Sequence, residues 1–272
     1  MATDLISSET LVLEMPTWDL VGKQAFVTGG ARGIGRALAL ALAAVIGTGA
    51  LLPVALPLWA ESRSGRHAGP ATAPGGRELA PDEALRKLLD GNRRFVGSDS
   101  LHPNQSIQWC RAVAEEQHPF AVVLGCSDSR VPPEVIFDGG LGDLFVVRAA
   151  GHIADDAAVG SIQYAVEHLG VPLVVVLGHK NCGAVRATVH AVTRRIEPRG
   201  HIARLVEDIK PAVEMHRGRS GDLVEHAVRA NVQRVVRQLL TSNPVLNESV
   251  RRGRIRIVGA YYDLHTGQVE LL

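Results

Sequence analysis

Three short, uninterrupted apolar runs mark the chain from Leu79 onward. They lie within residues 119–130, 144–151 and 171–182, and the first and third end in polar residues that include cysteine and histidine. Runs of this length and composition are typical of parallel strands that are buried on both faces. We therefore expect them to form a central, mostly parallel sheet.

Helical patterns alternate with these runs. Residues 81–96 begin with Pro81 and Asp82, which are frequent at helix starts, and their apolar side chains recur at helical spacing. Residues 156–170 show a second pattern of this kind, between the second and third runs. This alternation predicts an α/β fold with a mostly parallel central sheet flanked by helices. In such folds functional groups gather at the carboxyl ends of the strands.

The N-terminal part of the chain has a different composition. Residues 37–60 contain no charged side chain, and residues 61–78 are rich in Gly, Pro, Ala and Ser. We expect a leader at 1–36, a hydrophobic signal-anchor or signal segment at 37–60, a flexible linker at 61–78 and a folded domain at 79–272.

Membrane attachment is the interpretation that suits residues 37–60 best. About 20 apolar residues are enough to span a bilayer. Arg32 and Arg36 precede the segment, as expected for residues on the cytoplasmic side. We therefore expect the chain to be membrane-anchored or exported, and so extracytoplasmic. A cytoplasmic protein with a disordered, Ala-rich head is the alternative.

Charge and cysteine content narrow the possible partners and the possible roles of the thiols. Lys and Arg total 29 against 28 Asp and Glu, so the near-zero net charge gives no electrostatic reason to expect nucleic acid. The three cysteines are too few, and odd in number, for a disulfide framework. Metal ligation or simple packing explains the thiols better.

Candidate metal ligands follow the first and third apolar runs. Cys126 begins the segment Cys-Ser-Asp-Ser-Arg, and His179 and Cys182 lie three residues apart in Gly-His-Lys-Asn-Cys-Gly. Two thiolates and one imidazole suit zinc, which is borderline-soft and has no preferred d-electron geometry. For the His-x-x-Cys pair alone, the alternative is a buried thiol beside a satisfied core histidine.

The stretches CSDSRVPPE, GDLFVVR and GHKNCGAV resemble the β-class carbonic anhydrases, and the likeness runs from about Leu79 to the C-terminus. The resemblance implies one Zn²⁺ per chain, with Cys126, His179 and Cys182 as protein ligands and water in the fourth position. It implies reversible hydration of carbon dioxide to bicarbonate and a proton by zinc-bound hydroxide. A zinc-containing, bicarbonate-binding protein with little turnover is the alternative.

The same resemblance assigns Asp128 and Arg130 to a catalytic pair beside the metal. Asp128 would orient the hydroxide, and Arg130 would hold Asp128 ionised through two parallel hydrogen bonds. The alternative for both residues is a salt bridge in a turn after a strand.

Further positions resemble the substrate pocket of that family: Gln117, Phe145, Tyr164 and Gly183. Gln117 would contact the substrate, and Gly183 would offer a backbone N–H to bicarbonate. Phe145 and Tyr164 would form pocket walls, although an ordinary core suits them equally well. Because pocket walls in the family come from two subunits, we expect a homodimer or a higher homo-oligomer.

The chain also departs from the family pattern. Residues 148–152 are RAAGH, where the family often has RNAGN, so Ala149 and His152 lack amides that would fix this loop. His168 could relay protons, but a histidine on a helix surface is the simpler interpretation.

A second resemblance lies within residues 22–46, which are similar to the glycine-rich turn of short-chain dehydrogenases. The matching residues are Thr28, Gly29, Gly33, Ile34 and Gly35. A dinucleotide fold needs an acidic or basic residue about 20 positions later, where this chain is apolar. No tyrosine is followed by a lysine four places on, as the family's catalytic pair requires. The chain is therefore not a complete dehydrogenase.

Overall fold

The computed structural model describes residues 79–272. The predicted leader, hydrophobic segment, linker and glycine-rich turn lie outside these residues. Within residues 79–272, no helix combines the length and apolar character needed to cross a bilayer. Membrane attachment through residues 37–60 therefore stays a prediction.

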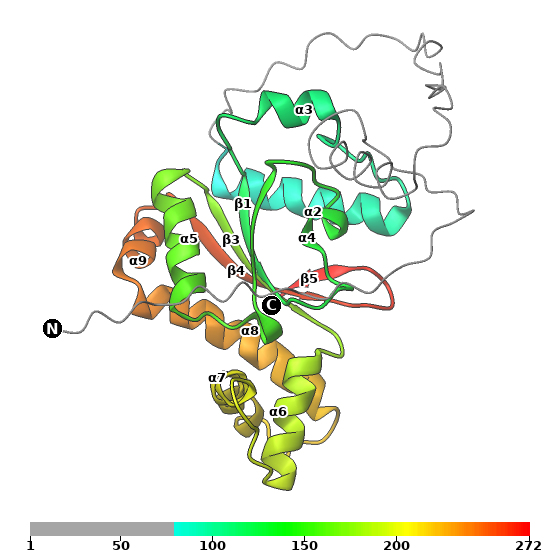
Figure 1. Ribbon diagram of the computed structural model, residues 1–272, viewed down its shortest axis with the longest axis vertical. Coiled ribbons are helices and arrows are strands. Elements are labelled where there is room, and N and C mark those ends of the chain that lie inside the picture. The colour runs from blue at the N-terminus through cyan, green and yellow to red at the C-terminus, as the bar shows by residue number, and fades with distance from the viewer. Residues whose placement is uncertain (1–78) are drawn as a thin grey trace, which may run out of the picture. The chain divides into compact units, whose positions relative to one another are not determined.

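A five-stranded sheet with the strand order β2-β1-β3-β4-β5 forms the centre of the fold (Figure 1). Its strands are β1 (Ala121–Gly125), β2 (Leu144–Arg148), β3 (Leu173–His179), β4 (Arg256–Tyr262) and β5 (Val269–Leu271). The first four pair in parallel and β5 pairs antiparallel to β4. The three apolar runs form β1, β2 and β3, so the predicted α/β fold with a mostly parallel sheet is confirmed.

Helices cover both faces of this sheet (Figure 1). They are α5 (Asp156–His168), α8 (Leu223–Ser242) and α9 (Pro244–Arg251) on one face, and α2 (Pro81–Gly97) and α4 (Pro133–Ile136) on the other. Successive residues of β1 pack into opposite cores, Val122 with α5 and α8, and Val123 with α2 and α4. Burial on both faces explains why this strand has no polar position.

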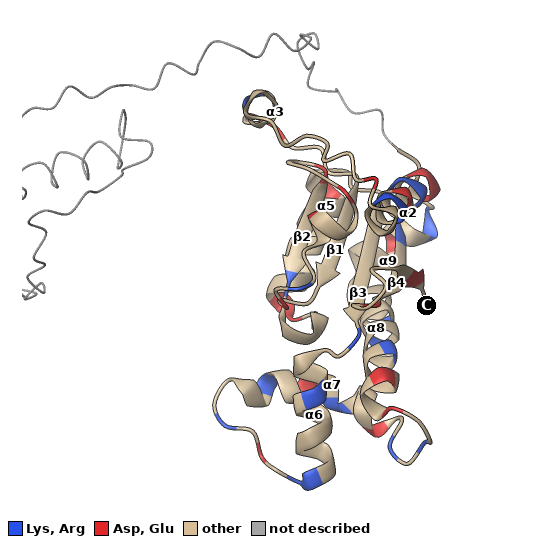
Figure 2. Ribbon diagram, turned by 90° about the vertical axis from the view of Figure 1, so that its right-hand side faces the viewer, with Lys and Arg blue, Asp and Glu red and all other residues tan. Residues whose placement is uncertain are grey.

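The remaining helices lie at the two ends of the sheet. They are α3 (Ile107–Ala112), the short 3₁₀ helix η1 (Ala150–His152), α6 (Gly183–Arg194) and α7 (Ile202–Glu214). Figure 2, which shows the sheet from its edge, places α3 beyond one end and α6 and α7 beyond the other. The helix predicted at 81–96 is α2, and the helix predicted at 156–170 is α5, which ends at His168.

Candidate metal centre

Cys126 is the first residue after β1, and its backbone is held from the neighbouring strand. Arg148, the last residue of β2, donates from Nε to the carbonyl of Cys126 (2.9 Å) and from its terminal nitrogen to the carbonyl of Asp128 (2.6 Å). Both hydrogen bonds fix the segment that leaves the strand. The Cys126 side chain is buried, with 4% of the residue exposed.

His179 ends β3, the strand next to β1, and is fully buried. Its Nδ1 lies 2.9 Å from the carbonyl of Lys180, so Nδ1 carries the proton in this contact. The other ring nitrogen, Nε2, is buried and has no hydrogen-bond partner among residues 79–272. A buried polar atom without a partner costs free energy unless something outside the protein chain binds it.

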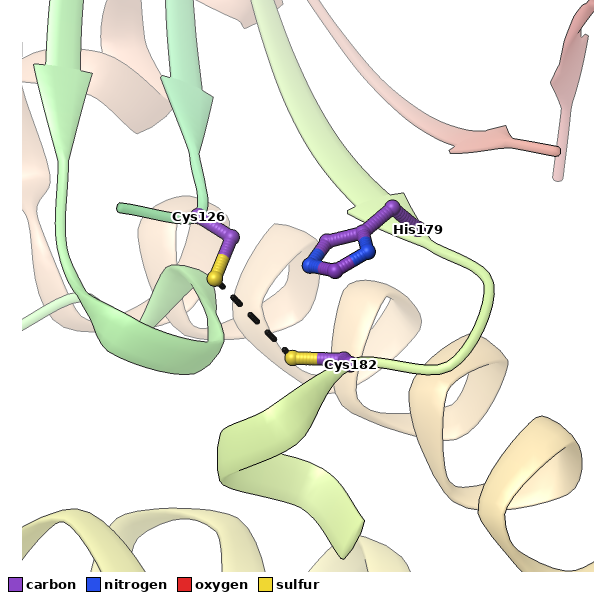
Figure 3. Close-up of side chains that lie close together, drawn as sticks. All are labelled: Cys126, His179 and Cys182. Atoms are coloured by element: carbon purple, nitrogen blue, oxygen red, sulfur yellow. Dashed lines mark hydrogen bonds between the residues drawn. The ribbon is translucent and has the colours of Figure 1, made fainter. Parts of the chain in front are cut away.

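Cys182 precedes the first residue of α6, so its sulfur lies at a helix N-terminus, where negative charge is stabilised. Cys126, His179 and Cys182 point toward one another in Figure 3, and their ligand atoms all lie within 4.8 Å of each other. The predicted ligand set is thus assembled from three separate strand and helix ends.

The spacing of the sulfurs fits a zinc ion. The two Sγ atoms are 3.9 Å apart. Two thiolates at about 2.3 Å from a tetrahedral zinc would lie about 3.8 Å apart. Together with the unpartnered imidazole nitrogen, this donor set matches a zinc site with three protein ligands. The alternative of a satisfied core histidine does not hold, because His179 Nε2 has no protein partner among the described residues.

The two thiols influence each other strongly. The hydrogen bond from Cys182 holds the pKa of Cys126 well below its usual range although burial raises it, and the N–H of Gly151 also lowers it. The same hydrogen bond, together with burial, raises the pKa of Cys182. The protein alone therefore favours a thiolate at Cys126 over one at Cys182, and a cation held by both sulfurs would favour loss of the second proton as well.

Asp128 and Arg130 form a two-pronged ion pair at the edge of this cluster. Arg130 donates from Nε to Asp128 Oδ1 (2.9 Å) and from its terminal nitrogen to Oδ2 (2.8 Å), and its backbone N–H also reaches Oδ1. Asp128 Oδ2 is 3.8 Å from His179 Nε2. The hydrogen bond from the Arg130 side chain is the main reason that the pKa of Asp128 lies far below its usual range. The carboxylate is therefore ionised at neutral pH.

The other predicted pocket residues lie in different places. Gly183 is at the N-terminus of α6 beside the cluster, and the position of a Cβ there would be open. Gln117 and Tyr164 line a hollow on the surface together with His168. Gln117 precedes β1, whereas Cys126 follows it, so the strand separates Gln117 from the metal ligands of the same chain.

Phe145 and Tyr164 lie close together but differ in how deeply they are buried. Phe145 is partly buried against the core, and its ring centroid is 6.3 Å from that of Tyr164. Tyr164 remains 47% exposed. His168 is exposed near the end of α5, as expected for a histidine on a helix surface.

The sequence does not reveal three residues that support the cluster. Arg148 fixes the backbone of Cys126, Gly151 donates its N–H to Cys126 Sγ (3.3 Å), and Asn231 donates to the carbonyl of Gly151 (3.0 Å). An amide from α8 therefore fixes this loop, although Ala149 and His152 offer none. Of these three residues, only Arg148 could have been suspected from the sequence, because it stands at the carboxyl end of a predicted strand.

The parallel sheet and the Cys-His-Cys cluster at its carboxyl edge together define an α/β protein with a candidate zinc centre. The family model described as carbonic anhydrase matches residues 121–269. Carbonic anhydrase of Mycolicibacterium smegmatis is 44% identical over 191 residues, which cover 70% of this chain and 93% of that protein. Carbonic anhydrase 2 of Mycobacterium tuberculosis is 42% identical, with 70% and 92% covered.

Solved structures agree with this match. The β-carbonic anhydrase CafA of Aspergillus fumigatus superposes with a TM-score of 0.54 at 28% identity, over 69% of this chain and 90% of that one. The chain belongs to the β-class carbonic anhydrase family.

Proposed function

We propose that this chain catalyses the reversible hydration of carbon dioxide to bicarbonate and a proton, with one zinc ion held by Cys126, His179 and Cys182. The observation that carries the proposal is the convergence of these three side chains beside an ionised Asp128. When bound, zinc would lower the pKa of a water molecule to about 7 and so make a nucleophile available at neutral pH.

Asp128 orients this nucleophile in the proposed mechanism. An ionised carboxylate only accepts hydrogen bonds, so it can hold the O–H of the attacking water and direct a lone pair toward carbon dioxide. Arg130 keeps the carboxylate ionised and fixes its plane through two parallel hydrogen bonds. In this proposal the N–H of Gly183, at the start of α6, donates to a bicarbonate oxygen.

A second copy of the chain completes the substrate pocket in this proposal. The five residues of β1 span about 17 Å at about 3.4 Å per residue, and they lie between Gln117 and Cys126. Gln117 is therefore too far away to contact a substrate at the metal of its own chain. If a neighbouring subunit supplies Gln117, Phe145 and Tyr164, their resemblance to pocket residues is explained. This arrangement requires a homodimer or a higher homo-oligomer.

The experiment is metal analysis combined with stopped-flow measurement of carbon dioxide hydration on the full chain. We expect about one zinc per chain, and we expect Cys182→Ser to lose the zinc and the activity because a hydroxyl is a poor replacement for a thiolate. Cys110→Ser is the matched control, since Cys110 is exposed and outside the cluster.

Two results would contradict the proposal in different ways. Full zinc content in Cys182→Ser would refute the ligand assignment. A wild-type protein that holds zinc but does not hydrate carbon dioxide would instead favour the bicarbonate-binding alternative.

A further inference from the structure

Two fully buried polar side chains, His152 and Asn231, lie next to the metal centre without belonging to its ligand set. Burying an imidazole or an amide is unfavourable unless its polar atoms are hydrogen-bonded. Their contacts therefore indicate what this polar pair contributes.

Asn231 projects from α8 to the η1 turn. Its Nδ2 lies 3.0 Å from the carbonyl oxygen of Gly151 and 3.1 Å from Nε2 of His152. Burial lowers the pKa of His152 to about 4, so its ring is neutral and Nε2 can accept this hydrogen bond. One amide group thus holds two successive residues of the turn.

Gly151 connects this turn to the metal centre. Its backbone N–H donates to Cys126 Sγ at 3.3 Å. Its φ is +72°, and a Cβ at this position would lie 2.6 Å from Cδ1 of Ile209 on α7 and 3.2 Å from Cβ of Ala184 on α6. The position of the turn is therefore fixed by close packing against α6 and α7 on one side and by the hydrogen bond from Asn231 on the other.

We propose that Asn231 is a positioning residue that holds the N–H of Gly151 on the Cys126 sulfur and thereby sets how strongly this thiolate donates to the metal. An N–H that donates to a thiolate withdraws charge from the sulfur, and outer partners of metal ligands both orient the ligands and tune the metal. The inference rests on the proposed function only in that it takes Cys126 to be a metal ligand.

The test compares full-length wild type and Asn231→Leu, each with cobalt(II) in place of zinc. Loss of the amide frees the turn and weakens the N–H···S bond, so the sulfur becomes richer in electrons. We expect the sulfur-to-cobalt charge-transfer band to move to longer wavelength for this reason. Because the freed turn no longer fixes the orientation of Cys126, we also expect metal affinity, measured by chelator competition, to fall roughly 10–100-fold.

Asn92→Leu is the matched control. Asn92 is also buried and donates to two backbone carbonyls, those of Ile136 and Gly267, but it lies in α2 on the other face of the sheet. Its loss should lower stability and leave the charge-transfer band in place. Asn231→Ser, whose hydroxyl is too short to reach the turn, provides a second test that leaves a smaller and still polar side chain.

The outcomes separate this inference from the proposed function. A folded Asn231→Leu or Asn231→Ser protein with the band and the metal affinity of wild type would overturn the positioning role. A wild-type protein with no sulfur-to-cobalt band would show that the ligand assignment itself has failed. A shifted band in the Asn231 variants and an unshifted band in Asn92→Leu would support the inference.

Discussion

At the scale of single residues, Asp128 has its charge and orientation fixed within the chain itself. Its carboxylate is 15% exposed, whereas the Arg130 side chain that holds it is 55% exposed. An ion pair this accessible to water contributes little to folding stability. The main effect of the ion pair is therefore to orient the Asp128 carboxylate oxygens. A substitution of Asp128 should affect catalysis much more than stability.

Asp128→Asn tests this distinction. The amide has the size of the carboxylate, but it cannot form two parallel hydrogen bonds with Arg130. It also donates hydrogen bonds, whereas the carboxylate only accepts them. We expect zinc content and thermal stability close to wild type, and a fall in the rate of carbon dioxide hydration on the order of 10²-fold, because orientation of the nucleophile is lost. Activity within about twofold of wild type would mean that the pair is only a salt bridge in a turn.

At the scale of elements, pairing between strands brings the ligands together. Gly125 of β1 pairs with Leu177 of β3 in parallel, so the residues that follow, Cys126 and His179, emerge at the same edge of the sheet. This part of the site can be predicted from sequence, because buried parallel strands and the polar residues after them are visible in the pattern.

Other elements lie beyond what the sequence pattern reveals. The pattern does not predict β4 and β5, and β5 has only three residues. Asn231 is one of several polar residues in α8, which has 20 residues. Nothing in the neighbouring sequence indicates that its side chain contacts Gly151 and His152, 80 and 79 positions earlier. Such contacts depend on how α8 packs across the sheet, which local periodicity does not specify.

Asp138 gives a prediction at this scale, because it joins α2 to the segment that follows it. Burial alone would raise the pKa of Asp138, but the N–H of Leu101, the guanidinium of Arg94 and the N–H of His102 all donate to the carboxylate and hold its pKa below the ordinary 3.8. A depressed pKa in the folded state means that the stabilisation is present above the unfolded value and is lost as pH falls through the folded one.

We therefore expect Asp138→Asn to lower the free energy of unfolding by about 1–3 kcal/mol at pH 7, since hydrogen bonds to a charged group are lost. The difference from wild type should shrink as pH falls below about 4. Urea denaturation at pH 7 and at a pH below about 4 measures this difference in the free energy of unfolding. Asp99→Asn is the control, because the Asp99 carboxylate is nearby in the sequence but exposed. A difference that does not change with pH would contradict the role of the charge.

At the scale of the whole molecule, the predicted site residues within 79–272 lie at two opposite ends of the sheet. The candidate metal centre lies at the carboxyl ends of the strands, and Gln117 lies between α3 and the start of β1. Figure 2 shows α3 beyond one end of the sheet and α6 and α7 beyond the other. The sequence predicts both sets of residues but not their separation, because motif resemblance contains no information about which chain supplies each side chain. In the proposed mechanism, an arrangement of two copies joins the two ends.

Mixing two inactive variants tests that arrangement. Gln117→Ala keeps its metal ligands, and Cys182→Ser keeps Gln117, so each alone should lose most of its activity. If Gln117 acts on the neighbouring subunit, a mixed dimer contains one intact site, and random reassociation should recover about a quarter of wild-type activity. No recovery despite verified subunit exchange would place Gln117 in its own chain's site or remove it from the pocket.

We propose that residues 37–60 attach the enzyme to a membrane or direct its export across one. An uncharged, Leu- and Ala-rich stretch of this length would leave a large apolar surface in water, and a bilayer removes that cost. The full-length protein should therefore fractionate with membranes or be shortened near Ala60. With Arg32 and Arg36 on the cytoplasmic side, protease added outside spheroplasts should digest the catalytic domain of the anchored form.

Replacement of both Ala43 and Ala44 by arginine provides the control for this prediction. Charge within the segment opposes insertion into a bilayer, so the variant should stay in the soluble fraction and resist protease added outside spheroplasts. The predicted zinc ligands lie far along the chain from both positions, so the variant should keep its metal and its activity. Intact protein found wholly in the soluble cytosolic fraction, for wild type and this variant alike, would defeat the proposal, because the apolar segment would then be accommodated without a membrane.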